Sequence, residues 1–156
     1  MKKKFNITGI CNPDVHYMMD NRAKLDKIME MVESGEYFTI HRPRQYGKTT
    51  TLAFLQDRLG KNDDYVCIKL SFEDVEDKWQ VSDDAFAQMF SIRLSNRLEY
   101  IDDNLNTFWE SIKAKITDMN TLSNAISQLV RHSKRRIVVL IDEVDASSNY
   151  ESFLKF

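Results

Sequence analysis

The chain has 156 residues, of which 42% are hydrophobic and 11% aromatic, and this composition supplies enough apolar material for one packed core. Its formal net charge of −2 at pH 7 excludes a long-range attraction of the whole molecule to nucleic acid or to an anionic membrane. Only four glycines and two prolines occur, which argues against low-complexity linkers. We therefore expect a single globular domain over residues 1–156.

The basic start Met1–Lys4 is not followed by the apolar stretch that a signal peptide requires. The longest purely apolar run, Ile137–Ile141, is far below the ~20 residues that span a bilayer. Cys11 and Cys67 belong to no CxxC pair, which argues against a metal site or a disulfide framework. The sequence thus predicts a cytoplasmic protein with reduced, structural thiols and no membrane partner.

The first predicted element is a helix that Asp20 or Asn21 can cap and that ends near Ser34–Gly35. Its apolar side chains recur at helical spacing at Leu25, Ile28, Met29 and Val32. Tyr37–Ile40 has the aromatic and β-branched composition of a strand. The next helix carries Leu52, Leu55 and Leu59 on one side and has Gly60 at its C-terminal end.

Residues 65–71 predict a second strand, and three amphipathic helices are expected between it and the last strand. The apolar positions of these helices are Phe86, Phe90, Leu94 and Leu98, then Leu105, Phe108, Trp109, Ile112 and Ile116, then Leu122, Ile126, Leu129 and Val130. Ile137–Ile141 is a continuous apolar run of the kind that is buried on both faces of a parallel sheet. The alternation of elements predicts an α/β fold with a mostly parallel sheet.

Gly47-Lys48-Thr49 stands between a predicted strand and a predicted helix. Backbone N–H groups at such a helix start point at a phosphate, and the helix dipole adds to the attraction. Lys48 can reach the β- and γ-phosphates of a nucleotide, and the Thr49 hydroxyl can ligate Mg²⁺. The pattern GxxxxGK[ST] has its first glycine at a position where this chain carries Arg42, so the loop must be entered differently.

Asp142 and Glu143 end the apolar strand, at the sheet edge where a phosphate-binding loop would lie. Asp142 can hold Mg²⁺ opposite Thr49, and Glu143 can act as the base that polarises an attacking water. The alternative is a solvated turn that closes an ordinary buried strand. The loop and the acidic pair, occurring in this order, favour nucleotide binding.

Residues 41–52, with Pro43-Arg44-Gln45 and Gly47-Lys48-Thr49, resemble the Walker A motif of prokaryotic AAA-like P-loop ATPases, and Val138–Glu143 resembles their Walker B strand. Tyr17–Arg22 is similar to the entry element of such modules. The resemblance implies a three-layer P-loop fold, with an entry segment and helix over residues 1–36 and a nucleotide-binding core over residues 37–156.

The resemblance also implies Mg²⁺-dependent binding of ATP and its hydrolysis, with Lys48 and Glu143 as catalytic residues and Thr49 and Asp142 as metal ligands. The nucleotide-binding positions that it implies are Pro43, Arg44, Gln45, Tyr46, Gly47, Lys48, Thr49 and Thr50. In such ATPases a sensor strand follows the Walker B strand, whereas this chain ends at Phe156. We therefore expect a sheet that is incomplete at the C-terminus, in a truncated chain.

Several weaker candidates have two interpretations. The basic cluster Arg131–Arg136 can contact nucleic acid, but it equally suits the end of a helix, which we favour. Arg42 and Arg44 can bind phosphate, on this chain or on a neighbouring one, or be solvated. Tyr17 and His16 can stack on adenine, although a packing or surface role is the simpler expectation.

Hydrolysis is not the only function compatible with these residues. A non-hydrolysing switch or scaffold, in which ATP or ADP orders the domain so that a protein partner docks, is the main alternative. Self-association is a further option. A nucleic-acid-associated motor rests on fold analogy alone.

Overall fold

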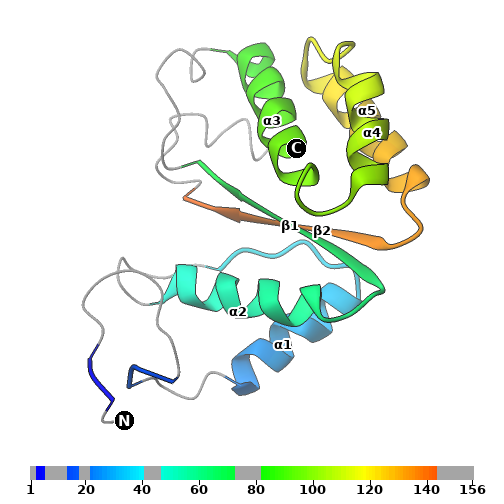
Figure 1. Cartoon of the computed structure of the whole chain (residues 1–156). Helices are drawn as coiled ribbons and strands as arrows, with labels where there is room; N and C mark the ends of the chain where they lie inside the picture. The colour runs from blue at the N-terminus through cyan, green and yellow to red at the C-terminus, as the bar shows by residue number, and fades with distance from the viewer. Residues whose placement is uncertain (1–2, 6–13, 18–21, 41–46, 73–81, 144–156) are drawn as a thin grey trace. The chain divides into compact units, whose positions relative to one another are not determined.

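The computed structural model describes residues 3–5, 14–17, 22–40, 47–72 and 82–143, and the chain forms two compact units, Met1–Lys61 and Asn62–Phe156 (Figure 1). In the first unit, α1 (Arg22–Glu33) buries Ile28 and Met29. After α1, Gly35 has a φ of 70° and its N–H donates to the carbonyl of Val32 at 3.0 Å. Glycine adopts this left-handed conformation without steric penalty, so the predicted end of the helix is confirmed. The predicted caps Asp20 and Asn21 lie outside the described residues.

The second helix of this unit, α2 (Lys48–Gly60), buries the three leucines that were predicted to share one side, Leu52, Leu55 and Leu59. It lies beside α1 (Figure 1). Arg58 on α2 forms an exposed ion pair with Asp26 on α1 at 2.6 Å. Exposed pairs of this kind contribute about 1 kcal/mol at most, so we attribute the association of the two helices mainly to their apolar side chains.

The strand predicted for Tyr37–Ile40 is wrong for this structure, which assigns no strand to these residues. Their composition favours extended backbone, but a strand also requires a neighbour that completes the ladder of hydrogen bonds. The two strands of the described sheet, β1 (Tyr65–Ser71) and β2 (Arg136–Asp142), pair with each other.

In the second unit, β1 and β2 run parallel, with Lys69 opposite Leu140 and Ser71 opposite Asp142. Parallel strands need a long crossover connection. The described part of this connection, from residue 82 onward, contains three helices, namely α3 (Asp83–Leu98), α4 (Asp103–Lys113) and α5 (Met119–His132). None of the helices in the described ranges is long and apolar enough to cross a membrane.

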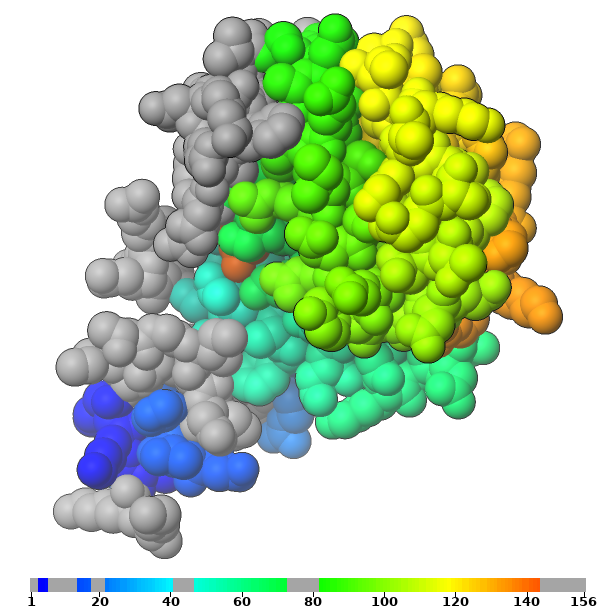
Figure 2. All heavy atoms as spheres, turned by 45° about the horizontal axis from the view of Figure 1, so that its top comes forward, coloured from blue at the N-terminus to red at the C-terminus, as the bar shows by residue number. Residues whose placement is uncertain are grey.

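One face of the sheet packs against the three helices, which lie together on that face (Figure 1) and whose side chains form a continuous surface (Figure 2). Alternate residues of β1 enter this core, because successive strand side chains point to opposite faces. They are Val66, Ile68 and Leu70, and Phe72, the residue after the strand, enters the core as well. The ring of Phe72 lies 6.1 Å from that of Phe86 and 6.3 Å from that of Phe90, both on α3. The core therefore fixes the carboxyl end of β1.

Burial in the second unit corrects three details of the sequence interpretation. Ile116 is buried, but it lies in the loop after α4 rather than in the helix. Val130 is 51% exposed, on the outer side of α5. Val139 is 39% exposed, so β2 is not buried on both faces. The reason for the last difference is that β2 has β1 as its one strand neighbour in the described sheet.

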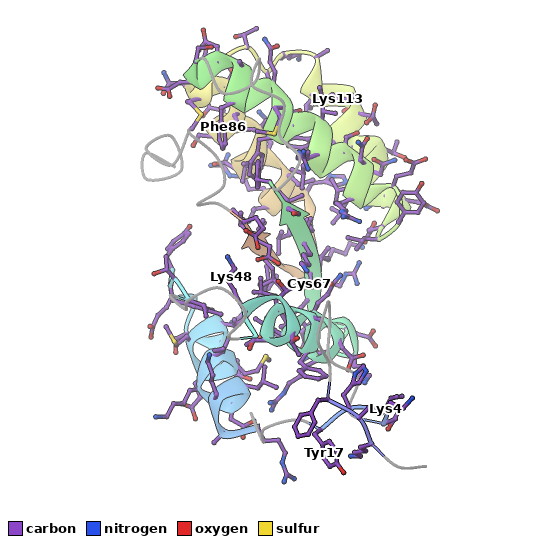
Figure 3. All side chains as sticks on the ribbon, turned by 90° about the vertical axis from the view of Figure 1, so that its left-hand side faces the viewer. Lys4, Tyr17, Lys48, Cys67, Phe86 and Lys113 are labelled. Atoms are coloured by element: carbon purple, nitrogen blue, oxygen red, sulfur yellow. The ribbon has the colours of Figure 1, made fainter. Side chains whose placement is uncertain are left out.

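The opposite face of β1 carries Cys67, which is buried and forms no disulfide (Figure 3). Burial raises the pKa of the Cys67 thiol to about 11. The thiol is therefore protonated at neutral pH and unreactive as a nucleophile. This agrees with the predicted structural role of Cys67, whereas Cys11 lies outside the described residues.

Asp102 joins the start of α4 to the segment before β2. Its carboxylate accepts a hydrogen bond from the backbone N–H of Leu105 at 3.0 Å and pairs with the Arg135 guanidinium. Partial burial acts to raise the pKa of Asp102. The hydrogen bond from Leu105 and the charge of Arg135 outweigh it, and the pKa lies below its ordinary value of 3.8.

We expect Asp102→Asn to reduce the loss of stability in acid. Because the folded-state pKa of Asp102 is depressed, its stabilising contribution is complete above the unfolded-state pKa and is lost as the pH falls through the folded-state value. Asparagine keeps the helix cap but cannot titrate. Thermal unfolding from pH 6 to pH 3 should show a smaller fall in Tm for the variant than for the wild type, and equal falls would contradict this assignment.

Candidate functional site

The first group of candidate residues lies at the start of α2. Gly47 is the N-cap residue with a φ of 74°, and it has no side chain that could cap the helix. The backbone N–H groups of the first helical turn, beginning at Lys48, have no carbonyl partner within their own helix. An uncapped helix start attracts anions through these groups and through the helix dipole. Lys48 projects from this first turn (Figure 3).

The backbone conformation at position 47 requires a glycine, whereas the space around it does not. A Cβ atom placed on it would meet no other atom within 4 Å. Its left-handed φ is the constraint, because a side chain in that conformation costs roughly 1–2 kcal/mol. The carbonyl of Gly47 accepts hydrogen bonds from both the backbone N–H and the hydroxyl of Thr51, each at 2.9 Å. The glycine is thus joined to the helix that it precedes.

The three threonines that follow Lys48 differ in exposure. Thr49 is half-buried, whereas Thr50 and Thr51 are buried in α2. The side chain of Thr49 is therefore the most accessible hydroxyl of the three for a ligand. The remaining predicted loop residues, Pro43, Arg44, Gln45 and Tyr46, lie outside the described residues, as does Arg42.

The second group of candidate residues lies at the end of β2. Asp142 is 4% exposed, and its Oδ1 accepts a hydrogen bond from the backbone N–H of Glu143 at 3.2 Å. Its Oδ2 lies 3.6 Å from the Nζ of Lys69 on β1. The main-chain carbonyl of Asp142 accepts from the N–H of Phe72, also at 3.2 Å. The carboxylate is therefore held at the carboxyl end of the sheet by both strands.

Glu143 has a φ of 58°, which makes it the one residue other than glycine with a positive φ in the described part of the chain. This region is unfavourable for a residue with a long side chain. Backbone strain of this kind is concentrated at functional sites, where the side chain is needed in one direction. The left-handed backbone turns the chain immediately after the strand and leaves Glu143 half-buried.

The side chains in these two groups suit different parts of a metal–nucleotide complex. The Thr49 hydroxyl and the Asp142 carboxylate are oxygen donors, the type that Mg²⁺ prefers. Lys48 and Thr49 belong to the first unit, and Asp142 and Glu143 belong to the second. Their meeting around one ligand stays a prediction. Within the described ranges, no cluster of three or more His, Cys, Asp or Glu side chains could hold a metal ion.

Sequence reasoning missed two cations at the carboxyl end of β1. Lys69 lies beside Asp142, and Arg93 on α3 donates to the carbonyl of Ser71 at 2.5 Å. The guanidinium of Arg93 also lies 5.5 Å from the centre of the Phe72 ring. The sequence did contain a signal for Lys69, because a lysine within an otherwise apolar strand needs an explanation. Arg93 gave no such signal, since it occupies a polar position on an amphipathic helix.

The weaker candidates are placed as follows. His16 forms an isolated bridge with Lys4, and Tyr17 contacts the ring of Phe5 at 5.1 Å between centroids (Figure 3 labels Lys4 and Tyr17). Stacking of Tyr17 on adenine stays a prediction. In the basic cluster, His132 ends α5 and stacks on Phe108 at 4.1 Å, which agrees with the helix-end interpretation.

Comparisons with known proteins identify the family. No curated protein and no solved structure matches the chain. A sequence model described as the AAA-like domain matches residues 11–155, which include both groups of candidate residues. This family implies a P-loop fold, and the mixed α/β structure with its parallel strand pair agrees with it. The chain belongs to the AAA-like domain family.

Proposed function

We propose that the chain is an Mg²⁺-dependent ATP-binding domain that hydrolyses ATP. The observation that carries this proposal is the left-handed Gly47 directly before Lys48 and Thr49, at the start of α2, where the N-cap residue has no capping side chain. In a P-loop protein this arrangement offers backbone N–H groups and one ammonium group to the phosphates. The match to the AAA-like domain over nearly the whole chain supports the proposed function. We further propose that residues 1–156 act as a single domain.

We assign the binding of the triphosphate to residues 43–50. The ammonium of Lys48 neutralises charge on the β- and γ-phosphates. The hydroxyl of Thr49 and the carboxylate of Asp142 hold Mg²⁺. When bound, Mg²⁺ would neutralise the charge that develops on the phosphate oxygens.

Glu143 is the proposed general base. Its carboxylate is not assigned to the metal, so it remains able to accept a proton from the attacking water. The strained φ of 58° supports this role, because strain is retained where a side chain must point in one direction. Attack of the water on the γ-phosphate then yields ADP and phosphate.

The proposal is tested by titrating the full chain with a fluorescent ATP analogue, with and without Mg²⁺, followed by an assay of phosphate release. We expect saturable binding that Mg²⁺ strengthens, together with steady release of phosphate. Saturable binding without phosphate release would identify the non-hydrolysing switch instead. If no binding occurs at millimolar nucleotide, the proposed function is wrong.

A further inference from the structure

Lys69 is an unusual residue for its place in the fold. It interrupts the apolar strand β1, yet its side chain is only 20% exposed. Lysine is rarely buried to this extent unless it is paired. Its Nζ lies 3.6 Å from the Oδ2 of Asp142, the residue to which we assign Mg²⁺.

The register of the sheet explains this approach. Ser71 is opposite Asp142 in the parallel pair, and Lys69 lies two residues earlier on β1. Residues two apart in a strand share a face, so Lys69 and Asp142 lie on the same face of the sheet. Arg93, also at this end of β1, donates to the main-chain carbonyl of Ser71.

We propose that Lys69 is a positioning residue that acts as the internal counter-cation of Asp142 in the metal-free protein, and that Mg²⁺ displaces it on binding. This inference rests on the proposed function, since it takes Asp142 as a metal ligand. A carboxylate that is 4% exposed needs a nearby positive charge, because a buried charge without a partner is strongly destabilising. Lys69 supplies that charge before the metal arrives.

The geometry of the pair suits displacement. At 3.6 Å the ammonium is within ion-pair distance of Oδ2 but beyond normal hydrogen-bonding distance. The four-carbon stem of lysine can carry the ammonium to another position without backbone movement. Once Mg²⁺ is bound, Lys69 and the metal repel each other, so the lysine lowers the metal affinity of the site.

The inference is tested by removing the charge of Lys69. We expect Lys69→Met to tighten Mn²⁺ binding about fivefold. A change in affinity of this order corresponds to the interaction energy of two unit charges about 4 Å apart in a water-like dielectric. Binding is measured by Mn²⁺ electron paramagnetic resonance on the full chain, saturated with a non-hydrolysable ATP analogue. Lys69→Arg, which keeps the charge, should stay within about twofold of the wild type.

The matched control is Lys113→Met. Lys113 is a lysine of the same unit that pairs with Glu110 at 2.7 Å, and it lies on α4, away from β1 and β2 (Figure 3). This variant should leave Mn²⁺ affinity unchanged. If Lys69→Met weakens Mn²⁺ binding or leaves it unchanged, the inference is overturned.

A second measurement tests the pairing without metal or nucleotide. In EDTA, unfolding of the wild type, Lys69→Met, Asp142→Asn and the double variant forms a double-mutant cycle. We expect the double variant to be less destabilised than the sum of the two single variants, whereas additive effects would overturn the pairing.

Asp142→Asn also separates the assignment of Asp142 as a metal ligand from the displacement of Lys69. If it binds Mn²⁺ like the wild type, the metal assignment of the proposed function fails, and the inference about displacement fails with it.

Discussion

Replacement of Lys48 with alanine is expected to lower the affinity for Mg·ATP by about 100-fold, which corresponds to the loss of a charge-assisted hydrogen bond to phosphate. Lys48 projects from the first turn of α2, next to backbone N–H groups that have no partner within their helix (Figure 3). The backbone groups remain in the variant, but the cation that neutralises the β- and γ-phosphates is gone. Isothermal titration calorimetry with a non-hydrolysable ATP analogue measures the change.

Lys61→Ala is the matched control for this experiment. Lys61 follows the last residue of α2, and its ammonium forms an exposed ion pair with Asp57 at 2.6 Å. Its removal should leave nucleotide affinity within about twofold of the wild-type value, because exposed pairs contribute little. Equal affinities of the wild type and the Lys48 variant would show that the start of α2 is not the nucleotide site.

Glu143→Gln is expected to leave ATP binding intact and to lower kcat at least about 100-fold, the usual contribution of a positioned general base. Glutamine has nearly the same shape as glutamate but cannot accept the proton of the attacking water. Steady-state phosphate release gives kcat, and the titration with the fluorescent analogue gives the affinity. Glu99→Gln, an exposed change in the same unit, is the control and should leave both values unchanged.

A glycine variant separates the backbone of Glu143 from its side chain. Glu143→Gly removes the base and also relieves the strain of a φ of 58°. The free energy of unfolding should rise by about 1 kcal/mol while turnover is lost. Undiminished turnover in either variant would mean that another group activates the water.

The sequence predicted the elements whose apolar spacing is most regular. In α3, Phe86, Phe90, Leu94 and Leu98 recur every four residues, and all four are buried. The strand predicted at residues 65–71 is observed with the same bounds. These predictions succeed because periodic burial of one face is a local property of the sequence.

The errors concern properties that depend on neighbours. Tyr37–Ile40 has strand composition but forms no strand, since the ladder has to come from another segment. Val139 was expected to be buried, but β2 has one strand partner in the described sheet. The spacing of apolar residues does not contain this information.

The candidate site was predictable as two motifs, but not in its detail. Residue types alone indicated Gly47, Lys48, Thr49, Asp142 and Glu143. The ion pair of Lys69 with Asp142 depends on the register of the sheet, and the left-handed backbone of Glu143 depends on how the strand ends. Both are tertiary properties of the second unit. The approach of Lys48 to Asp142 stays a prediction.

The contact of Arg93 with β1 has a mechanical consequence. Arg93 holds the carbonyl of Ser71, and the next residue, Phe72, donates its N–H to the carbonyl of Asp142. The single peptide unit between Ser71 and Phe72 therefore links α3 to the main chain of the acidic strand end. The path from α3 through Arg93 and this peptide unit reaches the main chain of Asp142 and not its carboxylate. A shift of α3 relative to the sheet would therefore act on Asp142 through its main chain.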